Sequence, residues 1–117
     1  MSFQDKFRAL LQEIQEKDLP VLVEGKKDQK TLQKLGLGNI ITLKKPLYQV
    51  VEELAAPEIV ILTDLDRAGR QLYRKLYHDC VQRGIKVNNR LRLFLLQETP
   101  LAHIEGLDTY LENSANK

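Results

Sequence analysis

Four carboxylates in this sequence stand where parallel strands would end, and their type and spacing could do chemistry. Glu24 directly follows the apolar run Val-Leu-Val, while Asp64 and Asp66 follow the run Ile-Val-Ile-Leu-Thr. Asp28 comes four residues after Glu24, at the start of a predicted helix. Because the carboxyl ends of parallel strands share one edge of a sheet, we expect the first three to converge there, with Asp28 as a candidate fourth.

Carboxylates packed this closely repel one another and raise one another's pKa, and a divalent cation relieves the repulsion. Oxygen ligands of this kind suit Mg²⁺, with Mn²⁺ as an alternative ion. A metal held in this way typically engages substrate phosphates, where it polarises the phosphoryl group, orients a water or stabilises the leaving oxygen. A plainer alternative is that Asp66 and Asp28 each cap a helix, since Asp is favoured at helix starts.

Apolar periodicity predicts the elements that position these residues. Residues 3–17 carry apolar side chains at helical spacing and predict an amphipathic helix. Short apolar runs predict strands, and helical patterns separate them. The predicted strands are 19–23, 40–43, 58–63 and 91–96, and the later helices are 28–35, 48–54, 66–83 and 107–113. This alternation predicts an α/β fold, compact and Rossmann-like, with a mainly parallel sheet of about four strands and helices on both faces.

Length and composition favour one domain, residues 1–117, made of an N-terminal helix (1–18) and a core (19–113). No apolar run approaches the roughly 20 residues of a membrane helix, so no membrane association is expected. The single cysteine, Cys80, permits no internal disulfide and no cysteine-based zinc site, and it is interpreted as a small core residue. The simplest compartment for such a chain is the cytoplasm.

Positive charge is concentrated in one part of the chain. The whole sequence has a net charge of only +2, whereas residues 67–92 hold eight basic side chains and one acid, Asp79, a net of +7. Basic residues near the acidic edge are Lys26, Lys27, Arg67, Arg70 and Arg74, and His78 extends the helical face of the three arginines. A basic rim around a metal-loaded carboxylate cluster suits a phosphate backbone, so nucleic acid, RNA or DNA, is the expected partner. The alternative is a solvated helix face.

His103 follows the predicted fourth strand and could reach the same sheet edge, where Glu105 or Asp108 would add a carboxylate. The preferred interpretation of this segment is simpler: a loop leading into a helix capped near Asp108. His78 is interpreted as a surface member of the basic face.

Two segments together resemble the two motifs of the Toprim domain, which primases, type IA and type II topoisomerases, OLD-family nucleases, the recombination mediator protein and ribonuclease M5 share. The first, Val-Leu-Val-Glu24-Gly25-Lys-Lys-Asp28, is similar to the version in primases and the 5S ribosomal RNA maturase. The second, Leu-Thr-Asp64-Leu-Asp66-Arg67-Ala-Gly69-Arg70, is similar to the topoisomerase IA version. The resemblance covers residues 19–113 and is greatest to small stand-alone Toprim proteins.

The resemblance implies a role for each matching residue. Glu24 would be the general acid or base of strand cleavage or joining. Asp64 and Asp66 would hold Mg²⁺, with Glu24 or Asp28 sharing it, and Gly25 and Gly69 would let the backbone turn tightly beside the site. Topoisomerase and complete primase activities are excluded for this chain alone, because its tyrosines lack the nucleophile's motif context and no polymerising or zinc-binding partner domain is present.

Two functions remain open from the sequence. The first is Mg²⁺-dependent hydrolysis of nucleic-acid phosphodiesters by an activated water. The second is a non-catalytic module that binds nucleic acid or ribonucleoprotein through the same basic face. A phosphatase of the haloacid dehalogenase type shares the Asp-x-Asp motif but places it on the first strand and leaves Glu24 unexplained. A P-loop is excluded because its glycine-lysine signature is missing. A protein partner or a homodimer is left open.

Overall fold

The structure, a computed structural model, describes residues 2–115. Helices and strands alternate along the chain, as the apolar periodicity predicts. In chain order they are α1 (Phe3–Lys17), β1 (Val21–Val23), α2 (Lys26–Lys34), β2 (Ile40–Thr42), α3 (Leu47–Glu52), β3 (Glu58–Ile61), α4 (Arg67–Gln82), β4 (Lys86–Val87), α5 (Arg90–Glu98), a 3₁₀ turn (Ile104–Gly106) and α6 (Leu107–Ala115).

The strands form one parallel sheet in the order β2-β1-β3-β4. Val21 of β1 pairs with Ile40 on one side and with Val60 of β3 on the other. Residues 21–23 of β1 and 59–61 of β3 are apolar and buried because helices cover both faces of these central strands, while β3 begins with the partly buried Glu58. The predicted α/β class and the four-stranded parallel sheet are therefore confirmed.

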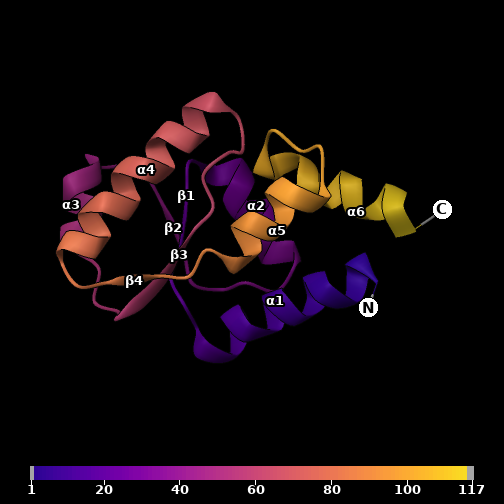
Figure 1. The fold of residues 1–117 in the computed structure, drawn as a ribbon, viewed down its shortest axis with the longest axis horizontal. Coiled ribbons are helices and arrows are strands. Elements are labelled where there is room, and N and C mark those ends of the chain that lie inside the picture. Colours follow the sequence, from indigo (N-terminus) through magenta and orange to yellow (C-terminus); the bar gives the residue numbers. More distant parts are fainter. Residues whose placement is uncertain (1, 116–117) are drawn as a thin grey trace.

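Alternate side chains of the central strands enter two separate cores. Val21 and Val23 pack with α1, α2 and α5, while Leu22 packs on the opposite face with α3 and α4. Figure 1 shows α3 and α4 on one side of the strands and α1, α2 and α5 on the other. Cys80 belongs to the second core, where burial raises the pKa of its thiol to about 11, so its prediction as a core residue is confirmed.

The predicted strand at residues 91–96 is wrong, because this segment is helix α5. The fourth strand is instead β4, whose Lys86 pairs with Glu58. The run Leu-Arg-Leu-Phe-Leu-Leu resembles alternation, yet of its apolar residues only Leu91 and Leu95, at helical spacing, are fully buried, while Leu93 is 44% exposed. The buried apolar residues of this segment are therefore four residues apart, as in a helix, and do not alternate as in a strand.

The N-terminal helix α1 begins with Ser2, whose hydroxyl accepts a hydrogen bond from the Asp5 amide. Phe7 of this helix is buried and, with Phe3, packs against Phe94 of α5. These contacts attach α1 to the sheet by way of α5. Among the described residues, no helix is both long and apolar enough to cross a membrane.

Candidate metal and nucleic-acid site

The structure brings the predicted carboxylates of β1 and β3 together at the carboxyl edge of the sheet. The Asp64 amide donates a hydrogen bond of 2.7 Å to Oε2 of Glu24. This bond crosses between loops 40 residues apart in sequence, which follows from the direct pairing of β1 with β3. Glu24 is thereby oriented by the backbone of the loop that carries Asp64.

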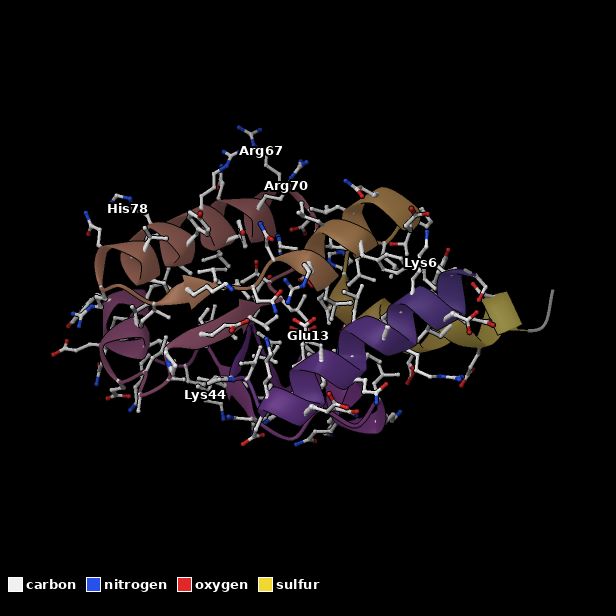
Figure 2. The ribbon with its side chains drawn as sticks, turned by 60° about the horizontal axis from the view of Figure 1, so that its bottom comes forward. Lys6, Glu13, Lys44, Arg67, Arg70 and His78 are labelled. Atoms are coloured by element: carbon white, nitrogen blue, oxygen red, sulfur yellow. The ribbon has the colours of Figure 1, made fainter. Side chains whose placement is uncertain are left out.

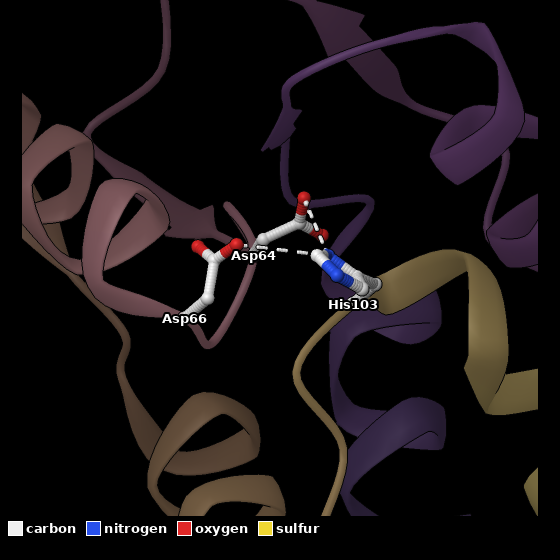
Figure 3. A group of neighbouring side chains, drawn as sticks. All are labelled: Asp64, Asp66 and His103. Carbon is white, nitrogen blue, oxygen red and sulfur yellow. Dashed lines mark ion pairs between the residues drawn. The ribbon is translucent and has the colours of Figure 1, made fainter.

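Asp64, Asp66 and His103 form a compact group (Figure 3), in which the two aspartates are partly buried and His103 is exposed. Nδ1 of His103 lies 3.4 Å from Oδ2 of Asp64 and 3.7 Å from Oδ2 of Asp66. One ligand atom from each residue fits within a span of 4.8 Å. The side chains are 20%, 36% and 55% exposed for Asp64, Asp66 and His103, so an ion or a phosphate could reach them.

The segment that carries His103 is docked onto the loop of Asp64 by backbone hydrogen bonds. The Ile104 amide donates to Oδ1 of Asp64 at 2.9 Å, and the Leu65 amide donates to the Ala102 carbonyl at 2.8 Å. Ile104 itself is fully buried. The segment is a loop before a helix, as the preferred interpretation has it, yet it also places His103 at the sheet edge.

The two neighbouring acids suggested by the sequence behave differently from His103. Asp108 pairs with Lys34 at 3.1 Å and is not part of the group formed by Asp64, Asp66 and His103. Glu105 is exposed, and its charge contributes to raising the pKa of Asp28. Asp108 is therefore an anchor of α6 rather than a member of the carboxylate group.

Burial and mutual repulsion make this edge of the sheet unfavourable for negative charge. Burial is the main cause that raises the pKa of Glu24, and the charges of Asp64 and Asp28 add to it. Asp28 is 7% exposed, and burial followed by the charge of Asp64 raises its pKa as well. Its carboxylate in turn accepts the Gly25 amide, which lowers the pKa and offsets part of the effect.

The helix-capping interpretation is confirmed for Asp66, whereas Asp28 is the third residue of α2 and bonds back to the N-cap residue, Gly25. Oδ1 of Asp66 accepts the Gly69 amide at 2.8 Å and caps α4, while its Oδ2 faces His103. Oδ2 of Asp28 accepts the Gly25 amide at 3.2 Å at the start of α2. Each carboxylate has two oxygens, so capping a helix leaves a second oxygen for other contacts.

Arg92 is the functional-site residue that the sequence did not single out. It lies in the basic segment 67–92, but it is only 2% exposed and lies under the Asp64 loop. Nη1 donates to the Thr63 carbonyl at 2.6 Å and Nη2 to the Asp64 carbonyl at 3.0 Å. Its guanidinium carbon lies 4.6 Å from the ring centre of Tyr73. A correct helical assignment of residues 90–98 would have placed Arg92 beside the buried Leu91 and indicated this position.

The two motif glycines are not equivalent. A Cβ on Gly69 would come within 1.9 Å of the Asp64 carbonyl oxygen, so only glycine lets α4 start this close to the loop. A Cβ on Gly25 would meet nothing within 4 Å, and its φ of −153° is accessible to any residue. The backbone therefore requires glycine at position 69, whereas the expectation that it also requires glycine at position 25 is wrong.

The predicted basic side chains lie exposed around the acidic edge. Helices α2 and α4 both begin there, since their N-caps are Gly25 and Asp66. Figure 2 shows Arg67, Arg70 and His78 along the outer side of α4. The exposed members of the predicted rim are Lys26, Lys27, Arg67, Arg70 and Arg74. Arg92, being buried, does not belong to it.

A parallel α/β sheet with a carboxylate group at its carboxyl edge and a basic helix beside it defines the class of this molecule. The chain belongs to the Toprim domain family, whose model matches residues 20–94. Membership associates the chain with divalent metals and with processing or binding of nucleic acid. The donor atoms of Asp64, Asp66 and His103 are those that a divalent cation accepts, so the residues fit such an ion. His103 lies beyond the residues that the family model matches.

Individual relatives are similar over most of their length. A UPF0292 protein of Methanocaldococcus jannaschii is 37% identical, over 90% of this chain and 91% of its own. A UPF0292 protein of Pyrococcus horikoshii is 35% identical, over 87% and 81% respectively. A solved structure of a protein from Aquifex aeolicus superposes with a TM-score of 0.76 at 30% identity, over 86% of this chain and 94% of that one. These relatives are consistent with a small stand-alone Toprim protein.

Proposed function

We propose that this protein is a divalent-metal-dependent phosphodiester hydrolase that acts on RNA or DNA. The observation that carries the proposal is the placement of Glu24, whose carboxylate is fixed by the Asp64 amide at the edge where the other acids gather. Exposed arginines of α4 begin directly beside this edge. The phosphate backbone of the nucleic acid and the metal would therefore meet at this edge of the sheet.

Each residue has a distinct task in this mechanism. Asp64 and Asp66 would hold the metal, with Glu24 or Asp28 sharing it, and the ion would polarise the phosphoryl group. Glu24 would move the proton, because a carboxyl group with a raised pKa is closer to the operating pH of a general acid or base. Arg67, Arg70 and Arg74 would position the phosphates, since guanidinium groups match phosphate oxygens in two-pronged fashion.

Cleavage of end-labelled RNA and DNA by the wild-type chain and by Glu24→Gln tests the catalytic proposal. The amide keeps an acceptor for the Asp64 amide but cannot carry a proton, so we expect turnover to fall by about 10²- to 10⁴-fold. Glu52→Gln, on the exposed side of α3, is the matched control and should cleave as the wild type does. Turnover that is equal in the wild type and Glu24→Gln would contradict the mechanism.

The second candidate function, a non-catalytic module that binds nucleic acid, has one observation in its favour. His103 already faces Asp64 and Asp66 and can offset part of their charge when protonated. Labelled RNA should bind Arg70→Ala/Arg74→Ala more weakly than wild type under both functions. If each arginine contacts one phosphate, the slope of log affinity against log salt concentration should be smaller by about 2. Tight binding with no turnover in the wild type would favour the binding module.

A further inference from the structure

His103 adds an imidazole to a group that would otherwise offer only oxygen ligands. The two carboxylates come from the loop after β3, whereas the imidazole comes from a segment 37 residues beyond Asp66, outside the residues that the family model matches. Two backbone hydrogen bonds and the burial of Ile104 fix this segment on the loop. The imidazole is therefore placed by the fold and does not arrive there as a free surface side chain.

The separations within the group suit ligands of a single ion. Nδ1 of His103 lies 3.4 and 3.7 Å from one oxygen of each aspartate. Ligand atoms that share an ion at roughly 2.0–2.2 Å lie about 3 to 4 Å apart, depending on the coordination geometry. The remaining carboxylate oxygens are engaged elsewhere, by the Ile104 amide for Asp64 and by the Gly69 amide for Asp66. These outer bonds orient the ligands in the way that supporting partners do at metal sites.

We propose that His103 is a metal ligand and that it makes this site prefer a transition-metal dication, Mn²⁺ or a later ion of the series, to Mg²⁺. Mg²⁺ favours oxygen ligands and keeps its waters, whereas imidazole binds transition ions more strongly. This inference rests on the metal-dependent function proposed above, and it names the ion that the same site takes.

The test measures metal binding directly and does not depend on turnover. Free Mn²⁺ is counted by electron paramagnetic resonance at pH 8 while protein is titrated, and Mg²⁺ is then added as the competitor. We expect wild-type protein to bind Mn²⁺ about tenfold or more tightly than Mg²⁺. In His103→Ala the affinity for Mn²⁺ should fall about tenfold or more, while that for Mg²⁺ changes by less than about threefold.

The chain offers a matched control, because its second histidine, His78, lies exposed on α4, 12 residues along the chain from the N-cap Asp66. His78→Ala should keep both affinities. His103→Asp replaces the imidazole with an oxygen donor and should bind Mg²⁺ at least as tightly as the wild type does, without the preference for Mn²⁺. Pulsed resonance of the Mn²⁺ complex should show coupling to a ¹⁴N nucleus in wild type and His78→Ala, and no such coupling in His103→Ala.

Two results would overturn the inference. Higher affinity for Mn²⁺ in His103→Ala would make His103 a counter-ion that competes with the metal, and unchanged affinity would mean that His103 is not a ligand. Loss of binding in Asp64→Asn/Asp66→Asn, with no effect of His103→Ala and no nitrogen coupling, would leave the metal at the aspartates and remove only His103. That second result would not contradict the proposed function, because the cleavage assay of Glu24→Gln tests that function separately.

Discussion

The two acidic loops of this molecule carry similar residues but are held in place by different means. The first loop, residues 24–28, is held by a contact within itself, because Asp28 accepts the Gly25 amide three residues away. The second loop, residues 63–69, is held from distant parts of the chain, since Arg92 donates to its carbonyls and the Ile104 amide donates to Asp64. The first loop is joined to this framework when Glu24 accepts the Asp64 amide.

This difference indicates where the geometry of the site is determined. The second loop has fixed carbonyls, a fixed carboxylate and a glycine that no larger residue can replace. The first loop contributes side chains to that framework and has open space around its glycine. Changes that disturb residues 63–69 should therefore affect both loops, whereas changes in residues 24–28 should remain local.

The largest expected effect is that of Gly69→Ala, compared with Gly25→Ala. The new methyl group at position 69 would overlap the backbone of Asp64, so we expect a loss of about 3 kcal/mol or more in the free energy of unfolding. Gly25→Ala meets no neighbour, and its effect should stay within about 1 kcal/mol. Urea unfolding of both variants measures the contrast. Equal stabilities would show that the second loop is no more constrained than the first.

Replacing the buried arginine should have the next largest effect. Arg92→Met keeps much of the volume but leaves the Thr63 and Asp64 carbonyls without their donor, so we expect a loss of about 2–4 kcal/mol. Affinity for Mn²⁺ should fall as well, because the loop that presents Asp64 loses its support. Arg83→Met, at the exposed end of α4, is the control and should change stability by less than about 0.5 kcal/mol.

A result in which Arg92→Met is destabilised but binds Mn²⁺ as the wild type does would separate the two roles. Arg92 would then stabilise the fold without positioning Asp64. Arg92→Lys, which keeps the charge but loses the planar fork, should lie between the wild type and Arg92→Met in stability.

The acidic framework could be predicted from the sequence because strand periodicity and strand ends are local properties. The runs before Glu24 and Asp64 indicated buried strands, and parallel pairing then required the two residues to share an edge. The supports of the second loop could not be predicted in this way. The Arg92 guanidinium donates to backbone carbonyls and the Ile104 amide donates to the Asp64 carboxylate, and both contacts form only when α5 and the following segment pack. The wrong strand prediction over residues 91–96 also concealed the position of Arg92.

Removing a carboxylate from the first loop should stabilise the protein in the absence of metal. The pKa of Asp28 in the folded state is raised above its ordinary value of 3.8, mainly by burial and then by Asp64, so its ionised form costs stability at neutral pH. The protonated carboxyl group of Asp28 stabilises the folded state fully below pH 3.8, and this stabilisation is lost as the pH rises through the raised pKa. Asp28→Asn keeps an acceptor for the Gly25 amide and should unfold at a higher temperature at pH 7 in EDTA.

This gain should shrink as the pH is lowered toward 4, where Asp28 becomes protonated in the folded wild type. Glu52→Gln, which removes an exposed acid, is the control and should show no comparable dependence on pH. A lower unfolding temperature for Asp28→Asn at pH 7 would mean that hydrogen bonding by the carboxylate outweighs its burial.

The smallest expected effect is that of Lys34→Ala, which is compared with Ile104→Ala to show how the His103 segment is held against the second loop. Lys34 and Asp108 join α2 to α6 through an ion pair of 3.1 Å, and the Lys34 side chain is 71% exposed. Ile104, by contrast, is fully buried in the first core. Lys34→Ala should therefore lower the free energy of unfolding by less than about 1 kcal/mol, and by less still at high salt, while Ile104→Ala should lower it by about 2–5 kcal/mol.

Affinity for Mn²⁺ should follow the same order, unchanged in Lys34→Ala and reduced in Ile104→Ala, because apolar burial rather than the ion pair keeps His103 beside the aspartates. A clear loss of Mn²⁺ affinity in Lys34→Ala would reverse that ranking.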